Sequence, residues 1–477
     1  MKKKSSQYIS VRESRRIIRY NIRQMKYYEA EKRRKKSPEE YTVPMRDPNN
    51  LIEIDNLKTC FFTDNGTVMS VNGVSFDIPK NKIVGVVGES GCGKSVTSLS
   101  VMQLVQAPQG QIVGGQIRFN PGDLGTDAEG RTLGYDIAKM PTDAMYKIRG
   151  KDITMIFQEP MTSLNPVFTI GYQLDEVSFL HTPDISREAA KAYSIEMLRK
   201  VGIAMPEHTY ESYPHELSGG MRQRVMIAMA LAGKPKLIIA DEPTTALDVT
   251  IQAQILELLR DLQKKEGCSI MLITHDLGVI AEMADEVVVM YAGRAIEKGT
   301  VQEIFHNPLH PYTVGLQRSK PMINSDTDEP LYSIPGQVPS PINMPDHCYF
   351  KGRCNRVCEV CRGTYPPDVK ITPTHTVACY RAETLAAENA AKAKAAEATK
   401  EQPATAEVVP QADEEGLCEK LVDLTGKTLG LLWRAGKAAG KKISDGLLLG
   451  ECMILGARQS RAEKKEKKSE KGGERHE

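Results

Sequence analysis

Residues 83–95 read IVGVVGESGCGKS, and this stretch decides how the chain folds. Its first five residues are apolar and mostly β-branched, which is typical of a short buried strand. The next eight match the phosphate-binding loop pattern, in which glycines let successive backbone N–H groups converge on phosphate oxygens. A helix is predicted to open at Val96, and its N-terminus would add partial positive charge. The stretch therefore predicts a strand, a phosphate-binding loop and a helix.

The loop also predicts which residues hold a nucleotide. Lys94 is expected to reach the β- and γ-phosphate oxygens, and the Ser95 hydroxyl to coordinate Mg²⁺. Cys92 would lie at a helix N-terminus, which can lower the pKa of a thiol, although small size alone also explains a cysteine there. The expected nucleotide contacts are Gly88, Glu89, Ser90, Gly91, Cys92, Gly93, Lys94, Ser95 and Val96.

A second apolar run, residues 237–240, ends in Asp241 and Glu242. Phosphoryl transfer depends on positioning and charge neutralisation, with one group that orients the attacking water. We predict that Asp241 belongs to the Mg²⁺ shell and that Glu242 is the general base. The alternative, two exposed acids that merely close a strand, does not explain why a purely apolar strand should end there.

Four further segments resemble the motifs of ABC ATPases. Residues 217–223, LSGGMRQ, resemble the signature motif, and Gln158, within FQEP, resembles the Q-loop glutamine. Residues 246–248, ALD, resemble the D-loop, and His275 resembles the switch histidine. The resemblance implies an α/β P-loop fold: an ABC nucleotide-binding domain with a RecA-like parallel sheet core, an antiparallel β subdomain and a helical subdomain that carries the signature.

The same resemblance assigns roles to these residues. Ser218, Gly219 and Gly220 would bind the γ-phosphate of a nucleotide held by a second ATPase subunit, so that a lone chain has no complete site. His275 would sense the γ-phosphate and the attacking water. Gln158 would coordinate Mg²⁺ and water and couple them to the contact with the permease.

An aromatic residue upstream of the loop is expected to stack on adenine. Phe61 occupies the place where ABC ATPases usually carry this residue, with Phe62 as the alternative. Stacking of either ring in the core would be the competing interpretation.

Three finer motifs resemble the ATP-binding subunits of oligopeptide and dipeptide importers. They are EPMTSLNP at 159–166, YPHE at 213–216 and HPYT at 310–313. This resemblance covers about residues 51–381 and implies an ATPase that drives peptide import, with ATP and Mg²⁺ as cofactors. It implies as partners a second ATPase subunit, identical or related, two membrane permeases and an extracytoplasmic peptide-binding protein, and a peripheral location on the cytoplasmic side of the cell membrane. A nickel importer of the same subfamily is the alternative.

Half of the chain's ten cysteines fall between Cys348 and Cys379. Such a density in a chain without a secretory signal pattern indicates a metal site in a reducing compartment. The resemblance to peptide-importer ATPases implies a [4Fe–4S] cluster on four of the five, with Cys358 as the extra residue. Tetrahedral Zn²⁺ and unmetallated thiols are the alternatives. The expected ligands are Cys348, Cys354, Cys361 and Cys379.

Composition divides the 477 residues into four parts. We predict a basic N-terminal extension at 1–50 and an ABC ATPase domain at 51–305, with its helical subdomain at about 160–232. A small Cys-rich C-terminal region follows at 306–381. Residues 382–477 are rich in Ala, Lys and Glu and are expected to be largely disordered or loosely helical.

The net charge of +2 hides an uneven distribution. Residues 1–40 hold fourteen Lys and Arg against five Asp and Glu, a net charge of +9, which leaves −7 for the rest. We predict an amphipathic helix here, with an apolar stripe opposite the basic residues. It would dock on an anionic membrane or a partner, or extend into solvent. The expected stripe is Val11, Ile18, Ile22, Met25 and Glu29.

Several functional classes do not fit this sequence. No nucleic-acid partner is expected, because the basic residues come without a recognisable RNA- or DNA-binding pattern. A translation-type ABC ATPase usually carries two cassettes, and a chromosome-type one needs a long coiled coil between Gln158 and Ser218. The late apolar stretch at 447–455 is far shorter than the roughly 20 residues that span a bilayer.

Overall fold

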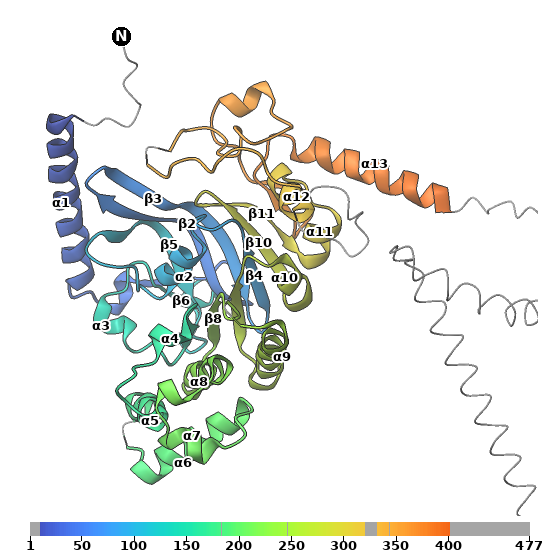
Figure 1. Ribbon diagram of the computed structural model, residues 1–477. Helices are drawn as coiled ribbons and strands as arrows, with labels where there is room; N and C mark the ends of the chain where they lie inside the picture. The colour runs from blue at the N-terminus through green and yellow to red at the C-terminus, as the bar shows by residue number, and fades with distance from the viewer. Residues whose placement is uncertain (1–9, 183, 246, 320–331, 343, 401–477) are drawn as a thin grey trace, which may run out of the picture. The chain divides into compact units, whose positions relative to one another are not determined.

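The computed structural model describes residues 10–182, 184–245, 247–319, 332–342 and 344–400 (Figure 1). Up to Glu397 these belong to one compact unit. Ala246 of the predicted D-loop lies outside the described residues. So do parts of the predicted extension, residues 1–9, of the Cys-rich region, residues 320–331 and 343, and of the tail, residues 401–477.

A large sheet forms the centre of the fold. Within the described residues it has eight strands in the order β12-β13-β11-β10-β4-β9-β8-β7. The five strands from β10 to β7 are parallel to one another, and β11 joins β10 antiparallel. The bounds are β4 Ile83–Val87, β7 Ile153–Ile156, β8 Leu237–Asp241, β9 Ser269–Ile273, β10 Glu286–Tyr291, β11 Arg294–Thr300, β12 Val369–Lys370 and β13 Thr376–Val377.

Both faces of the parallel part are buried, which explains why its strands are apolar throughout. Along β4, Val87 joins one hydrophobic core while Val84 and Val86 join the other. Successive residues of a strand point to opposite faces, so one continuous apolar run supplies two cores. The helices around this sheet are α2 Lys94–Val101, α9 Val249–Glu266, α10 Leu277–Met283, α11 Val301–His306 and α12 Pro311–Arg318.

A second sheet is built from the N-terminal part of the cassette. It has five strands in the described chain, in the order β1-β6-β5-β2-β3, and all neighbours are antiparallel. The long hairpin of β2 and β3 leads directly into β4 and so delivers the chain to the phosphate loop. The bounds are β1 Thr42–Pro44, β2 Asn50–Thr63, β3 Gly66–Pro79, β5 Gly110–Phe119 and β6 Leu133–Asp136.

A group of helices fills the interval between β7 and β8, where the sequence predicts the helical subdomain. Side-chain oxygens cap three of them: Thr169, Ser186 and Ser218 each accept a bond from a backbone N–H in the first turn. Helix α8 packs against α5, α6 and β7 and so joins this group to the central sheet. The bounds are α4 Pro160–Ser163, α5 Ile170–His181, α6 Arg187–Lys200, α7 Pro206–Glu211 and α8 Gly219–Ala232; the short α3, Thr142–Met145, precedes β7.

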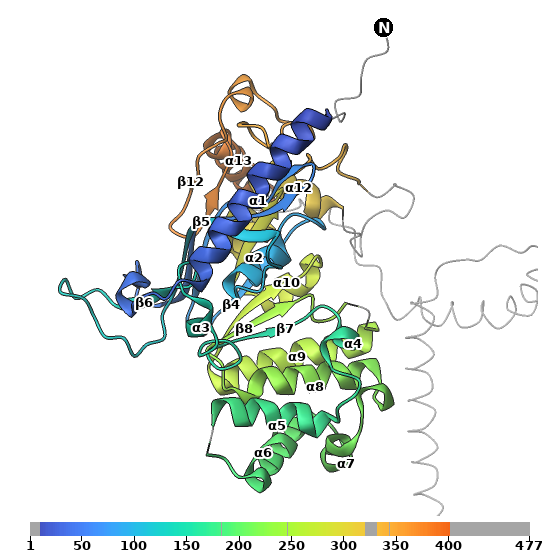
Figure 2. The same cartoon turned by 90° about the vertical axis from the view of Figure 1, so that its left-hand side faces the viewer.

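Helix α1, Val11–Arg33, lies across the antiparallel sheet and contacts β2, β3 and β5 (Figure 2). The predicted apolar stripe is partly wrong, because Val11 is 66% and Ile22 43% exposed. The polar Asn21 faces inward instead; it is 3% exposed and donates its amide N–H to the Thr63 carbonyl at 2.7 Å. The pattern of apolar residues cannot predict which face of the helix is buried when the residue that anchors that face is the polar Asn21.

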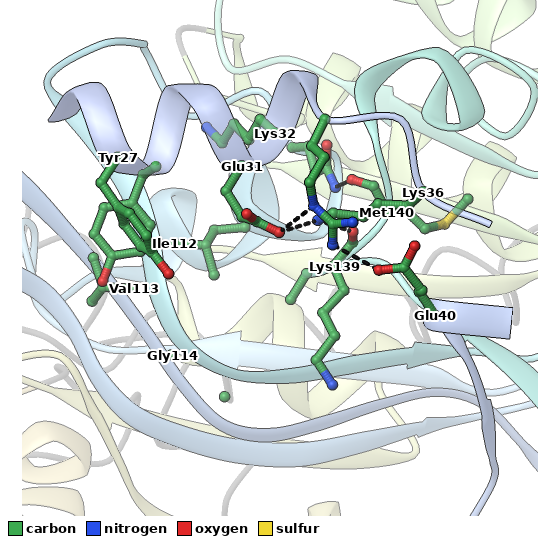
Figure 3. Close-up of a pocket in the computed structure, with 15 residues that line it drawn as sticks. Tyr27, Glu31, Lys32, Lys36, Glu40, Ile112, Val113, Gly114, Lys139 and Met140 are labelled. Carbon is green, nitrogen blue, oxygen red and sulfur yellow. Dashed lines mark hydrogen bonds and ion pairs between the residues drawn. The ribbon is translucent and has the colours of Figure 1, made fainter. Parts of the chain in front are cut away.

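The end of α1 is fixed by ion pairs above a cavity of about 350 Å³ (Figure 3). Arg34 pairs with Glu31 at 3.2 Å and with Glu40 at 2.6 Å. Lys36 pairs with Glu31 at 3.3 Å and donates to the Lys139 carbonyl at 2.9 Å, which ties the helix end to the segment after β6. The helix is therefore part of the folded unit.

The Cys-rich region is attached to the central sheet. Strand β13 pairs with β11, and β12 extends the sheet beyond it. Glu297 of β11 is fully buried, and its carboxylate accepts from the Leu309 and His310 backbone N–H groups and meets His375 Nε2 at 2.9 Å. Helix α13, Ala382–Lys400, follows. The buried bonds of Glu297 attach both the start of the Cys-rich region, at Leu309 and His310, and its end, at His375, to the cassette.

Candidate active site

The predicted phosphate and catalytic residues come from the carboxyl ends of four neighbouring parallel strands. The phosphate loop follows β4, Gln158 follows β7, Asp241 ends β8, and His275 follows β9. These strands are adjacent in the sheet, so their carboxyl ends meet at one edge. This edge is where α/β sheets bind their ligands.

Two loop glycines are required by the backbone. Gly88 has φ +153°, and a Cβ there would lie 2.2 Å from the Met290 carbonyl oxygen. Gly93 has φ +101°, and its Cβ would lie 2.4 Å from the Ser70 carbonyl oxygen. Any side chain would displace the loop, and Gly93 is also the residue that starts α2.

Lys94 and Ser95 lie at the loop's end in the first turn of α2. Lys94 is 5% exposed, and its ammonium donates to the Gly88 carbonyl at 2.9 Å and to the Glu89 carbonyl at 3.2 Å. The Ser95 hydroxyl donates to Asp241 Oδ1 at 3.0 Å. Burial raises the pKa of Asp241, while the Ser95 bond opposes that rise. Two of the three predicted Mg²⁺ ligands, Ser95 and Asp241, are thus adjacent, with the Lys94 ammonium near them.

Glu242 is the centre of the predicted catalytic residues. Its Oε2 accepts from Gln158 Nε2 at 3.0 Å and from the Thr245 hydroxyl at 3.0 Å, and His275 Nδ1 lies 3.4 Å from Oε1. The backbone of Glu242 has φ +48°, a conformation that costs a non-glycine residue energy and that clusters at functional sites. Thr245 was missed by the sequence analysis, although its position three residues after Glu242 in a turn is a usable signal.

Phe61 and Phe62 point to opposite sides of β2. Thr59, two residues before Phe61, bonds to Ser100 of α2 at 2.8 Å, so this side of the strand faces the phosphate-loop helix. Phe62 is 6% exposed and stacks on Tyr28 of α1 with ring centroids 6.4 Å apart. Phe61 is only partly buried, which leaves it as the candidate for stacking on a base.

The signature residues form the start of α8. The Ser218 hydroxyl accepts from the Met221 N–H at 3.3 Å, and Ser218 and Gly219 are exposed. Gly219 has no atom within 4 Å of a Cβ position, whereas Gly220 lies against Ile251 of α9. An exposed helix start is suited to bind a phosphate that comes from outside the chain, because the helix N-terminus carries partial positive charge.

Two family models match the chain. "ABC transporter" matches residues 71–245, and "Oligopeptide/dipeptide transporter, C-terminal region" matches residues 296–361. The oligopeptide transport ATP-binding protein AppD of Bacillus subtilis is 48% identical over 340 residues, which cover 71% of this chain and 99% of AppD. The chain belongs to the ATP-binding proteins of oligopeptide/dipeptide ABC transporters. It is an ABC transporter ATPase, and the predicted fold class is confirmed.

Other relatives of this ABC ATPase carry similar names. The oligopeptide protein OppD of Bacillus subtilis is 50% identical over 327 residues, covering 69% of this chain and 87% of OppD. The dipeptide protein DppD of the same organism is 46% identical over 330 residues, covering 69% and 94%. Among solved structures, the dimeric cassette MJ0796 bound to ADP and Pi matches at 24% identity, with TM-score 0.44, over 52% of this chain and 98% of that one.

The C-terminal region of the ABC ATPase bonds directly to the phosphate loop. The Arg353 guanidinium makes two bonds to the Glu89 carboxylate, at 2.8 and 3.0 Å, with the arginine side chain 7% exposed. The Glu89 N–H donates to the Tyr312 hydroxyl at 2.8 Å. Arg353 also donates to the Pro335 carbonyl at 3.0 Å. Sequence analysis missed this contact, since 264 positions separate its partners.

Arg353→Ala is expected to raise the KM for ATP by about 5- to 10-fold with little change in kcat, because a two-bond ion pair that steadies the loop is lost. Steady-state ATPase kinetics measure both constants. Arg353→Lys keeps the charge without the paired geometry and should lie between. An unchanged KM in Arg353→Ala would show that the loop holds its shape without this arginine.

Cys92 is buried beneath the loop of the ABC ATPase, with 1% exposure. Burial raises the pKa of its thiol, and the nearby Lys94 charge only partly opposes this. The hypothesis of a lowered pKa at the helix N-terminus is therefore wrong. Desolvation outweighs the helix field, and a small apolar residue is what this position requires.

The four predicted cluster ligands of the ABC ATPase line one small cavity of about 20 Å³. All eight cysteines in the described ranges are free thiols, and Cys358 Sγ lies 3.1 Å from Cys361 Sγ. Among the described residues, no group of three or more His, Cys, Asp or Glu is arranged to hold a metal ion. The four cysteines that line the small cavity are Cys348, Cys354, Cys361 and Cys379.

Proposed function

We propose that this chain hydrolyses ATP to energise the import of oligopeptides or dipeptides across the cytoplasmic membrane. The observation that carries the proposal is the cluster in which Gln158 and His275 meet the two carboxylate oxygens of Glu242, beside the phosphate loop. The C-terminal match to oligopeptide/dipeptide transporters and the three relatives named for peptide transport support the substrate class over the nickel alternative.

The reaction is attack of water on the γ-phosphate of ATP. Lys94 and the loop N–H groups bind the phosphates, and Phe61 stacks on adenine. Ser95, Asp241 and Gln158 would hold Mg²⁺, which neutralises the developing charge on the phosphates. The adjacency of Ser95 and Asp241 supports this donor set, since hydroxyl and carboxylate oxygens suit Mg²⁺.

Glu242 receives the proton of the attacking water. As the new P–O bond forms, the bond between the γ-phosphorus and the bridging oxygen breaks and its electron pair leaves with ADP. Gln158 and Thr245 orient the carboxylate through Oε2, and His275 lies at Oε1, from where it would contact the γ-phosphate. These side-chain contacts therefore aim the base.

Each complete site needs a second ATPase subunit. The signature residues Ser218, Gly219 and Gly220, the first two of them exposed, bind the γ-phosphate of the nucleotide held by the partner, whose own signature completes the first site. The partner is either an identical or a related ATPase subunit, and mass spectrometry of the purified complex distinguishes the two.

The permeases dock on a groove of about 500 Å³ beside Gln158. Its lining is mostly apolar and includes the exposed Phe157, Tyr146 and Leu180 from three separate segments. An exposed apolar groove of this size fits a partner helix. In the described part of the chain, no helix is long and apolar enough to cross a membrane. As the ATPase of a peptide importer, the chain works peripherally on the cytoplasmic side, with two permeases and an extracytoplasmic peptide-binding protein.

In this proposal, each predicted part of the chain has its own role. The ATPase domain is residues 51–305, with the helical part at 160–232 carrying the signature, and residues 306–381 form the attached C-terminal region. Co-purification of the tagged chain, followed by mass spectrometry and ATPase assays with candidate peptides, tests the proposal. Two permeases in the complex and stimulation by peptides are expected; a complex without permeases would overturn it.

The four cysteines around the small cavity are proposed to hold a [4Fe–4S] cluster, with Zn²⁺ as the alternative. Four cysteines that line one cavity can supply the four thiolates that either group requires. The cluster would tie the start of the region to its end, a structural role.

Iron and acid-labile sulfide in anaerobically purified protein are expected at about four atoms each per chain. Cys379→Ser should lose most of the iron, because it removes one of the four ligands. Cys358→Ser is the matched control and should keep it. Zinc in place of iron, or no metal in the unsubstituted chain, would contradict the cluster.

A further inference from the structure

Helix α1 lies outside the part of the chain that resembles peptide importers, which begins at about residue 51, and the site described above does not use it. It is nevertheless held rigidly. Asn21 bonds to Thr63, Gln111 of β5 donates to Glu29 at 2.7 Å, and Tyr28 stacks on Phe62. A helix held by three such contacts presents one fixed face to its surroundings.

The outward face of α1 is strongly basic. Glu13 is the one exposed acid on the helix. Six exposed cations make no ion pair with any residue in the described ranges, whereas Arg33 is paired with Glu29 at 3.7 Å. The six are Arg12, Arg15, Arg16, Arg19, Arg23 and Lys26, and we call their side of the helix the basic face.

Large apolar side chains lie among these cations. Tyr20 is 57% and Tyr27 61% exposed, in addition to the exposed Val11 and Ile22. At helical spacing Tyr20 and Tyr27 flank the basic face on one side, and Val11 and Ile22 flank it on the other. Cations bordered by tyrosine and aliphatic side chains are typical of helices that lie in a membrane interface. The arginines meet the headgroups, and the apolar side chains enter the boundary of the acyl chains.

The helix that carries the basic face ends near the groove that the proposed function assigns to the permeases. Figure 2 shows α1 crossing the front of the molecule, with α3 near its end. Lys32, in the last turns of α1, lines the same cavity as Gln103, and Arg149 donates to the Gln103 carbonyl at 3.0 Å. Arg149 lines the apolar groove that the proposed function assigns to the permeases.

We propose that the basic face of α1 binds the anionic lipid headgroups of the membrane beside the permeases. The proposal rests on the proposed function only for its location, since the charge and exposure of the face are independent of the ATPase. Lipid is favoured over nucleic acid because the exposed apolar side chains have a place in a bilayer interface and none on a phosphate backbone.

The test uses the full chain, purified without permeases, and sedimentation with vesicles. Binding is expected to phosphatidylcholine vesicles that contain phosphatidylglycerol, to be weak with phosphatidylcholine alone, and to fall in high salt. The double variant R19E/R23E is expected to weaken binding at least about tenfold, because two attractive charges become repulsive.

The matched control is K264E/K265E, the same change of charge on exposed residues of α9, which Figure 1 shows away from α1. It should bind like the unsubstituted chain. ATPase activity of R19E/R23E should be unchanged, which separates this proposal from the proposed function. Equal binding to neutral vesicles, full binding by R19E/R23E, or capture of duplex DNA or isolated permeases in place of anionic vesicles would overturn the proposal.

Discussion

Glu242→Gln is expected to leave ATP bound and to slow its hydrolysis by about 10²- to 10⁴-fold, the contribution typical of a general base. The amide has nearly the shape of the carboxylate, and its oxygen can still accept from Gln158 or Thr245, so the turn at the end of β8 should persist. What it cannot do is take the proton of the attacking water. The loss should therefore appear in kcat.

Two measurements separate this from a general loss of structure. Nucleotide binding by fluorescent ATP analogue should match the unsubstituted chain, and single-turnover hydrolysis should show the whole defect. Asp261→Asn, an exposed acid in α9, is the control for removal of one charge and should hydrolyse ATP normally. Hydrolysis by Glu242→Gln at the original rate would remove Glu242 from the mechanism.

Lys94→Ala is expected to abolish measurable nucleotide binding and to reduce kcat/KM for ATP by about 10²- to 10³-fold, the effect of removing one preorganised donor to a charged transition state. The ammonium is buried and held by the Gly88 and Glu89 carbonyls at the loop's edge. Its removal leaves these carbonyls facing the phosphates without a cation between them.

Titration calorimetry with ATP and Mg²⁺ measures the expected loss. Lys298→Ala, in β11, is the control. The Lys298 ammonium bonds to the Ser75 carbonyl and to Asp368 and not to the loop, so this variant should change only the stability of the protein. Retention of ATP affinity by Lys94→Ala would mean that the loop N–H groups alone bind the phosphates.

The parts of the site that sequence could predict are those carried by local pattern. The apolar run before the loop coincides with β4, and the run before Asp241 gives β8 with one more residue. Because parallel strands bring their carboxyl ends to one edge, the motifs after β4, β7, β8 and β9 had to meet. The fold class followed from the same motifs.

The parts that sequence missed depend on contacts across long separations or on a balance of opposing effects. Arg353 lies 264 positions after Glu89 in the sequence, and no pattern near either residue predicts the pair. Asn21 faces inward and bonds to the Thr63 carbonyl, whereas Ile22 of the predicted stripe is exposed. Cys92 lies both at a helix N-terminus, which lowers the pKa of a thiol, and in a buried position, which raises it. Only the structure shows that burial has the larger effect.

Transport by the reconstituted complex tests the central claim most directly. The chain, its partner ATPase, the permeases and the peptide-binding protein would be placed in proteoliposomes, with labelled oligopeptide on the binding-protein side and ATP on the ATPase side. We expect ATP-dependent peptide accumulation that disappears with the Glu242→Gln subunit. Accumulation that continues with this variant, or ATP hydrolysis that drives uptake of nickel but of no peptide, would contradict the account.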